Sequence, residues 1–369
     1  MAYWREYNKS MTSDFLSCLE SEYNLQNFNS LAVPARARWL ATITCENQLL
    51  DAIQFARGKN CPLLVMGGGS NLLLPDRFNG LVIRLATQGR KILRNTDQMV
   101  EIEVAGGENW HQLVTWSVLN NYSGLENLAL IPGSVGAAPI QNIGAYGAEL
   151  GNCLIKVEAL DIATGSKLEF SNRRCQFGYR DSIFKRELRG KVIITKVVLK
   201  LQKRPQLNLN YPALAEYLGR QGINQPTVKD VCQAVVAIRQ SKLPDPEVIP
   251  NAGSFFKNPI LSAANHQRLK NQYPNLVSYP TANHQYKIAA AWLLEQAGWK
   301  GKMVDGIAMH DQQALVLVNP NRCNSRQVID FASQVQLSIK QQFDVALEIE
   351  PLIVNNTATP SDSNLGKAG

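Results

Sequence analysis

The sequence lacks the patterns of cysteine and histidine that would build a disulfide framework or a metal centre. The seven cysteines are odd in number and widely spaced, without a CxxC pair, and the four histidines show no ligand spacing. These absences argue against an extracellular disulfide scaffold and against a zinc site. We therefore expect no bound metal and a reducing, cytoplasmic location.

Long apolar runs and dense runs of one charge are also missing. No apolar stretch reaches membrane-spanning length, and we expect no secretory signal at the start of the chain. The formal net charge is +8, but the densest basic stretch, residues 200–204, is short. A scattered basic surface is the simpler interpretation, and it would also attract nucleotide phosphates. We expect no membrane and no nucleic acid among the partners.

What is present is an ordinary globular composition, with 369 residues of which 45% are hydrophobic and 18% charged. A chain of this length exceeds one simple core, so two or three domains are expected. Residues 36–43 alternate as a strand, and residues 46–57 carry a helical apolar stripe, for which Thr44 is a plausible N-cap. Similar patterns predict strands at 62–66, 81–85, 99–105, 154–162, 167–170 and 192–201 and a helix at 109–119.

The pattern changes near residue 204, where helices begin to dominate. Helices are predicted at 228–238, 261–270, 288–295 and 325–341, with Asn324 and Gln327 as a capping box for the last, and strands at 314–318 and 345–354. The sequence therefore predicts an α+β fold. Its expected parts are an N-terminal extension at 1–24, a larger module at 25–204 that divides into two subdomains near 88, a C-terminal α/β domain at 205–354 and a disordered tail at 355–369.

Three consecutive glycines follow the predicted strand at 62–66. Gly67, Gly68 and Gly69 let the backbone approach a ligand closely, and their N–H groups could form an anion-binding nest to which Ser70 and Asn71 add donors. The sequence matches neither GxGxxG nor a P-loop. Taken alone, it is equally well explained by a tight structural turn.

A second stretch, residues 131–147, is rich in small side chains. Such a run makes a poor core but a good wall for a flat ligand, for example an isoalloxazine ring. A long structural loop is the alternative, but two such stretches in one module favour a cofactor site. The candidate cofactor contacts in this stretch are Pro132, Gly133, Ser134, Gly136, Asn142, Gly144 and Ala145.

These two stretches and three later segments together resemble the UDP-N-acetylenolpyruvoylglucosamine reductase family. The later segments are FGYRDSIFK at 177–185, KLPDP at 242–246 and NAGSFFKNP at 251–259. The resemblance covers roughly residues 25–354, and Tyr211 in LNYP is similar to the substrate-closing tyrosine of the longer family type. Two segments depart from the family pattern: NSLA at 29–32 replaces the usual NTFG, and EPL at 350–352 replaces EVR.

The resemblance implies a two-part FAD-binding module of the vanillyl-alcohol-oxidase (PCMH) type at 25–204 and a substrate-binding domain at 205–354. It also implies the reaction: NADPH reduces FAD, and the reduced flavin N5 then gives a hydride to the vinyl carbon of UDP-N-acetylglucosamine enolpyruvate. The product, UDP-N-acetylmuramate, is a peptidoglycan precursor. We expect the enzyme to act as a monomer.

Three residues are implied as catalytic by the same resemblance. Arg180 would hold the substrate carboxylate and meet the negative charge that develops there. Glu350 would be the second stabilising group, protonated or tightly bonded, because another negative charge beside an anionic intermediate is unfavourable. Strand spacing alone cannot separate Glu350 from Glu348, two residues earlier. Ser254 would give the proton to the carbon.

The remaining implied residues bind the ligands. FAD would be held by the two glycine-rich stretches, with Arg239 near the flavin N1–C2=O edge. The diphosphate and uridine parts of the substrate would be met by basic and polar side chains, with Tyr211 closing over them. The residues implied for substrate binding are Tyr179, Tyr211, Lys242, Lys257, Asn258 and Gln313.

Two other classes of protein remain open on the sequence. Another FAD-dependent oxidoreductase of the same fold would keep the glycine-rich stretches but would not need the Ser254 and Lys242 segments. A non-enzymatic nucleotide-binding module would need phosphate contacts but no flavin. A bound yellow chromophore would exclude the second class, and turnover of the enolpyruvyl sugar nucleotide would exclude the first.

Overall fold

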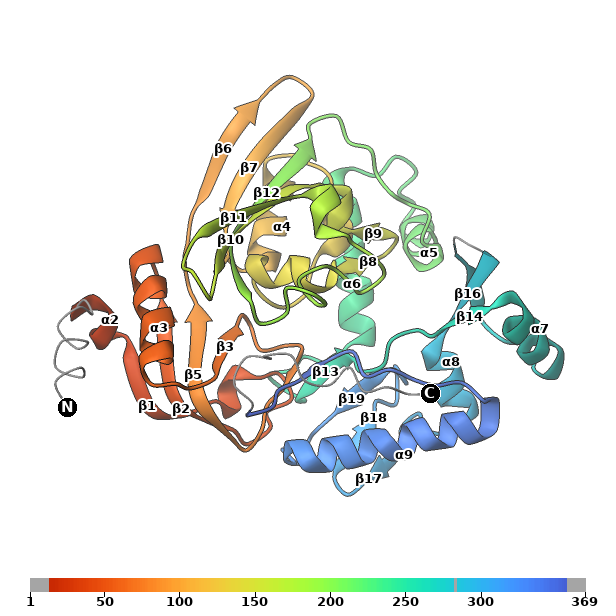
Figure 1. Ribbon diagram of the computed structural model, residues 1–369. Coiled ribbons are helices and arrows are strands. Elements are labelled where there is room, and N and C mark those ends of the chain that lie inside the picture. Colours follow the sequence, from red (N-terminus) through yellow and green to blue (C-terminus); the bar gives the residue numbers. More distant parts are fainter. Residues whose placement is uncertain (1–12, 282–283, 357–369) are drawn as a thin grey trace.

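The computed structural model describes residues 13–281 and 284–356, and the α+β prediction is confirmed in them. Three parts are visible in Figure 1: a four-stranded N-terminal sheet, a five-stranded sheet with the helices beside it, and a C-terminal part that includes the long helix α9. The first part leads into the second along the chain, and the third returns to the first.

The N-terminal sheet has the strand order β1-β2-β5-β3. Its strands are β1 (Leu19–Asn24), β2 (Arg36–Ile43), β5 (Arg77–Leu85) and β3 (Leu63–Met66), and only the edge strand β1 runs antiparallel to its neighbour. Helices α2 (Ser13–Ser17) and α3 (Glu46–Gly58) pack here, with Phe15 of α2 and most apolar side chains of α3 buried. Strand β1 therefore comes from the predicted N-terminal extension, whose residues 1–12 lie outside the described residues.

The predicted N-cap of α3 is wrong. The cap position is occupied by Cys45, whose side chain makes no capping hydrogen bond. Thr44 instead donates from its backbone N–H and its hydroxyl to Gln48 Oε1, at 2.8 and 3.0 Å. The helix therefore begins one residue later than a Thr44 cap requires, with the Gln48 side chain reaching back to the strand end.

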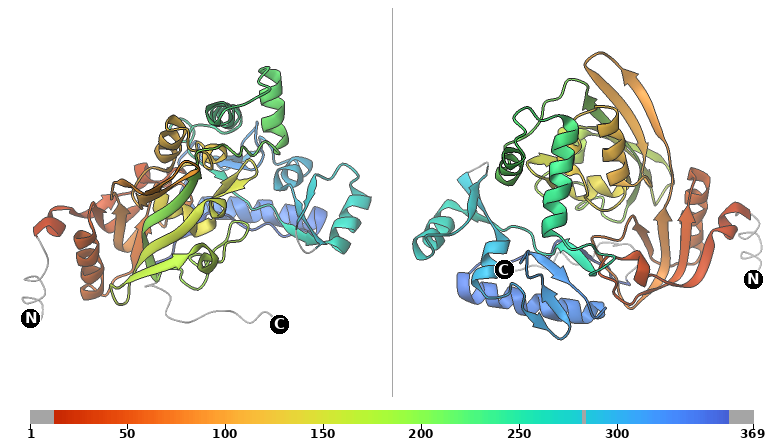
Figure 2. Two further views of the ribbon diagram at one scale, coloured as in Figure 1. Left: turned by 90° about the horizontal axis from the view of Figure 1, so that it is seen from above. Right: turned by 180° about the vertical axis from the view of Figure 1, so that it is seen from behind.

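The second sheet is fully antiparallel, in the order β11-β10-β12-β7-β6. Its strands are β6 (Arg90–Asn95), β7 (Met99–Ala105), β10 (Leu154–Asp161), β11 (Lys167–Ser171) and β12 (Val192–Gln202), and the predicted β10–β11 hairpin is confirmed. Helix α4 (Trp110–Leu119) packs in the same core, as do α5 (Pro212–Arg220) and α6 (Val228–Lys242). Figure 2 shows α6 beside α4 and α5. By packing, residues 212–242 therefore group with the second sheet, although the division at 204 itself stays a prediction.

The C-terminal part contains two small antiparallel sheets. One has the order β13-β19-β18-β17 and the other β14-β16-β15. The strands are β13 (Asn251–Ser254), β14 (Ile260–Ser262), β15 (Ser278–Pro280), β16 (Gln285–Ile288), β17 (Met303–Val304), β18 (Ile307–Met309) and β19 (Val316–Val318). The helices are α7 (Ala263–Gln272), α8 (Ala290–Gln296) and α9 (Ser325–Phe343). The capping box of Asn324 and Gln327 is confirmed at the start of α9.

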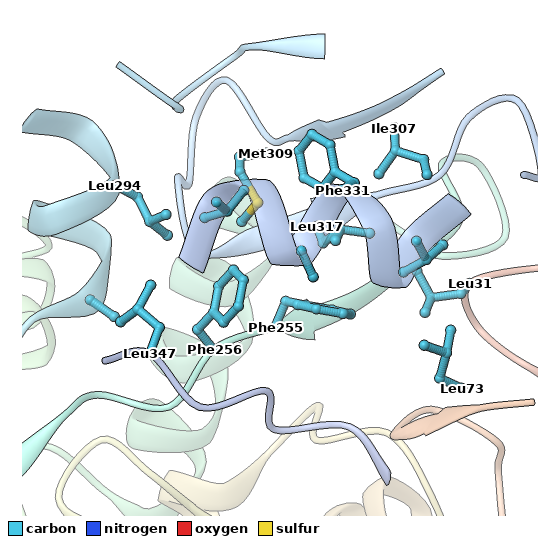
Figure 3. Packing of buried hydrophobic residues seen from close by; sticks show 14 of the residues in the cluster. Leu31, Leu73, Phe255, Phe256, Leu294, Ile307, Met309, Leu317, Phe331 and Leu347 are labelled. Atoms are coloured by element: carbon cyan, nitrogen blue, oxygen red, sulfur yellow. The ribbon is translucent and has the colours of Figure 1, made fainter. Parts of the chain in front are cut away.

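One hydrophobic core joins the C-terminal part to the N-terminal sheet. Leu31 and Leu73 lie beside Phe255, Leu317 and the helix α9 (Figure 3), and all belong to the same buried cluster. Within the predicted strand at 345–354, only β20 (Leu352–Ile353) is a regular strand, and it pairs in parallel with β4 (Leu72–Leu73). The last described strand therefore lies beside β4, the strand that directly follows the first glycine-rich turn in the sequence.

Candidate flavin and substrate site

The two glycine-rich stretches meet face to face. A Cβ placed on Gly67 would lie 2.4 Å from the Ser134 hydroxyl oxygen, and one placed on Gly68 would lie 3.0 Å from Gly133 Cα. Both contacts are tighter than most Cβ contacts, so a larger residue at either position would have to displace the facing segment or the Ser134 hydroxyl, and glycine favours this approach. Asn71 Nδ2 also donates to Gln141 Oε1 at 2.8 Å. The structure thus brings together the two candidate cofactor segments.

The NSLA segment supports the first turn from its other side. The Ser30 backbone N–H donates to Gly69 O at 3.3 Å, and its hydroxyl donates to Ser70 O at 3.4 Å. Gly69 has φ +65, and a Cβ there would lie 1.9 Å from Phe28 O. Ser30 O in turn accepts from Asn251 N at 2.8 Å. Despite its departure from the family pattern, the segment links the glycine turn to β13.

A cleft lies between the N-terminal sheet and the second sheet. Gly67, Ser134 and Gly136 line it, together with apolar side chains from β3, β5 and β12. A Cβ on Gly136 would lie 3.0 Å from Ile194 O, so the second stretch lies close against β12. Small residues on one wall and apolar side chains on the other suit a flat aromatic cofactor.

Asn142 has a structural part in this wall. It is almost fully buried, and its Nδ2 donates to Glu149 Oε2 at 2.7 Å and to Gly178 O at 3.2 Å. Its Oδ1 accepts from Gly151 N at 2.9 Å. All of these hydrogen bonds are to other groups of the protein. Asn142 therefore links the second glycine-rich stretch to the turn that carries Arg180.

Arg239 provides a buried donor without a protein partner. It lies on α6, and its Nε has no hydrogen-bond partner among the described residues. Burial lowers the pKa of its guanidinium, while Tyr146 opposes this shift and Arg180 adds to it. A buried N–H without an acceptor is costly. An electron-rich edge of a bound cofactor would satisfy it, so Arg239 and the paired glycine stretches fit FAD.

Arg180 and Glu350 face each other across the junction of the parts. Arg180 Nε lies 3.2 Å from Glu350 Oε1, but no acceptor lies in line with this N–H. Another guanidinium nitrogen, Nη2, donates to Gly144 O at 2.8 Å. Gly144 permits this approach, because a Cβ there would lie 3.2 Å from Arg180 Nη1. The guanidinium is held in place and keeps donor capacity for a ligand.

The structure separates the two glutamates that strand spacing could not. Glu348 is 71% exposed in its side chain and forms an ion pair with Lys257, whereas Glu350 is 9% exposed and faces Arg180. Burial raises the pKa of the Glu350 carboxyl, although Arg180, Lys185 and Lys257 oppose the rise. Glu350 is therefore the member of the pair that can be held as a neutral acid.

Ser254 reaches the same place from β13. The strand register shifts between Asn251 and Ser254, an irregularity of the kind that re-aims side chains beside active sites. The next residue, Phe255, is bonded to Glu350 through its carbonyl, which accepts from Glu350 N at 2.9 Å. Ser254 is exposed rather than buried. The residue after Ser254 is thus bonded through its backbone to Glu350, while the role of Ser254 stays a prediction.

The implied substrate residues are only partly brought together. Asn258 lies beside the Tyr179 hydroxyl, whose pKa is raised by burial against the effect of Arg180. The Tyr211 ring packs on Tyr146 with ring centroids 5.0 Å apart. Lys242 is exposed at the end of α6, and Gln313 is half-buried before β19. The placement of these last two does not by itself assign them to a ligand.

Two lysines of this site were not among the residues singled out in the sequence. Lys185 donates from Nζ to Arg180 O at 3.2 Å and lies close enough to Glu350 to influence its charge. Lys287, on β16, places its Nζ 4.9 Å from the Tyr179 ring centroid. Lys185 ends the FGYRDSIFK segment and could have been singled out there. Lys287 carries no local signal, because only the fold brings β16 to Tyr179.

Comparisons with known proteins agree with this geometry. A family model described as "FAD binding domain" matches residues 37–171, and the model "UDP-N-acetylenolpyruvoylglucosamine reductase, C-terminal domain" matches residues 245–354. The fold and the first match define an FAD-dependent oxidoreductase, which confirms the predicted fold class and flavin cofactor.

The relatives narrow the class to one family. UDP-N-acetylenolpyruvoylglucosamine reductase from Pseudomonas fluorescens strain Pf-5 is 45% identical over 333 residues, which cover 90% of this chain and 98% of that protein. The enzyme of the same name from Pseudomonas aeruginosa strain PAO1 is also 45% identical over 333 residues, with the same coverage. The chain belongs to the UDP-N-acetylenolpyruvoylglucosamine reductase family. The crystal structure of the Thermus caldophilus enzyme shares the fold, with a TM-score of 0.64 at 24% identity over 91% of this chain and 99% of that one.

None of the described helices is both long and apolar enough to cross a membrane.

Proposed function

We propose that this chain reduces UDP-N-acetylglucosamine enolpyruvate to UDP-N-acetylmuramate with electrons from NADPH, as a step of peptidoglycan precursor synthesis. The observation that carries the proposal is the contact between Arg180 Nε and the buried Glu350 carboxyl, 3.2 Å apart, at the junction of the flavin-type module and the C-terminal part. A donor, a neutral acid and a hydroxyl at one place suit the protonation of a carbon next to a carboxylate.

Bound FAD would carry the hydride from NADPH to the vinyl carbon of the substrate. The paired glycine turns at 67–71 and 132–136 would hold it, since glycines let the two backbones approach each other and a ligand closely. The orphaned Nε of Arg239 would donate to the polar edge of the ring system. Asn142, Gly144 and Ala145 would hold the second glycine-rich stretch, which forms this wall, at a fixed position relative to Arg180.

Arg180 would stabilise the negative charge that grows on the substrate carboxylate. Its guanidinium is already anchored to Gly144 O, so little reorganisation is needed when the charge develops. Glu350 would keep its proton to higher pH than an ordinary carboxyl, because burial raises its pKa although Arg180, Lys185 and Lys257 oppose the rise. A neutral carboxyl can donate to the substrate carboxylate, whereas an ionised one would repel it.

Ser254 would deliver the proton to the carbon. A hydroxyl is a weak acid and must be held close to the carbon that it protonates. The irregular β13 and the Phe255–Glu350 backbone bond fix its position.

The substrate diphosphate and uridine would be met by Lys257, Asn258, Lys242 and the aromatic pair of Tyr211 and Tyr146. Tyr179 and Gln313 would line the same region. Lys257 pairs with the exposed Glu348, so a phosphate would have to displace that carboxylate to reach the ammonium. We further propose a cytoplasmic monomer, in keeping with cysteines that are all free among the described residues.

The test is anaerobic stopped-flow absorbance at the visible flavin band. NADPH should bleach the band, and UDP-N-acetylglucosamine enolpyruvate should then restore it rapidly. Bleaching without recovery would exclude the proposed substrate, and a protein purified under native conditions that binds no flavin would exclude the reaction.

A further inference from the structure

The Arg180 side chain depends on a backbone shape that arginine does not favour. Gly178 and Asp181 exchange backbone hydrogen bonds of 3.0 and 3.2 Å, so Tyr179 and Arg180 form the tip of a tight turn. Arg180 has φ +54, which is sterically unfavourable for a residue with a Cβ. This conformation persists only if the surroundings hold it, and such residues cluster where function needs a fixed direction.

Lys185 is the side chain that closes over this turn. Its Nζ donates to the carbonyl oxygen of Arg180 at 3.2 Å, from five residues further along the chain. Between them, the Ser182 hydroxyl donates to Ile140 O at 2.6 Å, so the segment is fastened to the second glycine-rich stretch as well. Ser182 fastens the segment to the wall, whereas Lys185 bonds the peptide unit of Arg180 itself.

The Lys185 ammonium is also part of the charge around Glu350. The groups that act on the Glu350 carboxyl are the cations Arg180, Lys185 and Lys257, and Glu350 in turn acts on the nearby Tyr179 hydroxyl. Lys185 further feels Glu348 and Asp181, and burial together with Lys257 lowers the pKa of its ammonium. Burial and Lys257 disfavour the charged form of Lys185, and the carboxylates of Glu350, Glu348 and Asp181 offset part of that cost. A half-buried ammonium that donates to the Arg180 carbonyl has more than a surface contact.

We propose that Lys185 is a positioning residue for the reduction. It holds the left-handed Arg180 turn so that the guanidinium faces the substrate carboxylate, and it keeps a positive charge beside Glu350. The inference rests on the proposed function, because it assigns Lys185 to the step in which the sugar nucleotide is reduced and not to the step in which NADPH is oxidised.

The test compares Lys185→Met with wild type in the two half-reactions. NADPH should bleach the flavin at the wild-type rate, whereas reoxidation by UDP-N-acetylglucosamine enolpyruvate should slow by about 100-fold, the loss expected when a catalytic group is misplaced by about 1 Å. Lys185→Arg keeps a charged donor and should recover part of the rate. Lys191→Met, an exposed lysine of the same segment, is the matched control and should match wild type.

The pH profile of reoxidation separates positioning from general damage. Glu350 loses a neighbouring cation in Lys185→Met, so its carboxyl should deprotonate at higher pH than in wild type. In the plot of reoxidation rate against pH, the change in rate that is caused by Glu350 is the one that is absent from Glu350→Gln. This change should occur at higher pH in Lys185→Met than in wild type. A purely structural defect would lower the rate equally at every pH and leave this change at its wild-type pH, which would overturn the proposal.

Two further outcomes are distinguishable. If wild type is not reoxidised by the sugar nucleotide, the proposed function fails and this inference fails with it. If wild type is reoxidised and Lys185→Met matches it, only the role of Lys185 fails. If Lys185→Met does not retain FAD, Lys185→Gln is measured in its place, because glutamine keeps a hydrogen-bond donor and removes the charge. A shift of the Glu350-dependent change in reoxidation rate to higher pH supports the proposal, and the absence of a shift contradicts it.

Discussion

At the scale of single residues, the buried Glu350 carboxyl governs how the site responds to pH. Burial raises its pKa above the ordinary value of 4.5, and three nearby cations reduce the rise without cancelling it. A carboxyl with a higher pKa in the folded than in the unfolded protein binds more protons when folded. Its contribution to stability is present below the unfolded pKa and is lost as the pH rises through the folded pKa.

Glu350→Gln should therefore gain stability relative to wild type as the pH rises. The amide does not titrate, so the free energy of unfolding of the variant should not fall where that of wild type does. Urea unfolding of both proteins between pH 4 and pH 8 measures the difference. The exposed Glu247→Gln is the control, and a Glu350→Gln difference as flat as that of the control would contradict the buried neutral acid.

Ser254 gives the second prediction at this scale. Ser254→Ala removes the proposed proton donor, so reduction of the sugar nucleotide should slow by about 100-fold or more, the usual contribution of a positioned acid. Flavin bleaching by NADPH should stay close to wild type, and Ser254→Cys should keep some activity. Stopped-flow absorbance measures both steps. Slow bleaching in Ser254→Ala would count against the assignment.

At the scale of elements, the two glycine-rich turns act as one unit. A Cβ on Gly67 would contact the Ser134 hydroxyl at 2.4 Å. We expect Gly67→Ala to cost about 1–3 kcal/mol of cofactor binding through overpacking, which is roughly 5- to 150-fold in the FAD dissociation constant. Titration of the FAD-free protein, followed by flavin fluorescence, measures this constant.

A second substitution tests the cause of that loss. Ser134→Ala removes the closest atom, so the double variant should regain part of the affinity that Gly67→Ala loses, and the two effects should not add. Gly219→Ala is the control, because it lies in α5 with nothing within 4 Å of its added Cβ. Strictly additive losses would show that the two turns are independent.

Many of the longer elements, among them β2, α3, β12 and α9, could be predicted from local periodicity, but β1, β6, α5 and the short strands β13 to β18 were not predicted. The strands 36–43 and 99–105 occur at the predicted bounds. Buried and partly buried residues alternate throughout 99–105, whereas the alternation in 36–43 is interrupted at Leu40 and Ala41, which are both buried. The Thr44 cap was wrong because Cys45 occupies the cap position. The backbone N–H and the hydroxyl of Thr44 donate to the Gln48 side chain instead. The segment 345–354 reads as a strand but is mostly extended chain, since sheet partners meet it only at Ile349 and at β20.

The candidate site shows the same limit. The glycine-rich turns were visible in the sequence because their chemistry is local to each segment. The choice of Glu350 over Glu348 was not, because it depends on which carboxyl the fold buries. Lys287 could not be found either, since its contact with Tyr179 joins β16 to a turn of the flavin-type module.

At the scale of the whole molecule, the hydrophobic cores do not follow chain order. Residues 245–354 match one family model, yet their core is shared with Leu40, Phe78 and Val82 of the N-terminal sheet. The second sheet has a separate core, completed by α5 and α6. Domains recognised by sequence and units that bury a core are therefore different divisions of this chain.

Fragments should reveal this difference. A fragment of residues 86–243 carries its core with it and should unfold cooperatively, whereas a fragment of 245–354 exposes the apolar face that the N-terminal sheet covers and should not. Near-UV circular dichroism and urea titration measure cooperativity. Cooperative unfolding of 245–354 alone would contradict the shared core.

The pairing of β20 with β4 has a consequence for how the protein is made. The ribosome releases the glycine turn at 67–71 before the second sheet is made, but the strand that pairs beside it, Leu352–Ile353, emerges only after the second sheet and the helices α5 to α9. Until then the apolar face around Leu73 has no cover from the C-terminal part. The nascent chain must stay able to fold while the later elements are still being synthesised. We therefore expect FAD to bind tightly only after the C-terminal part has been translated.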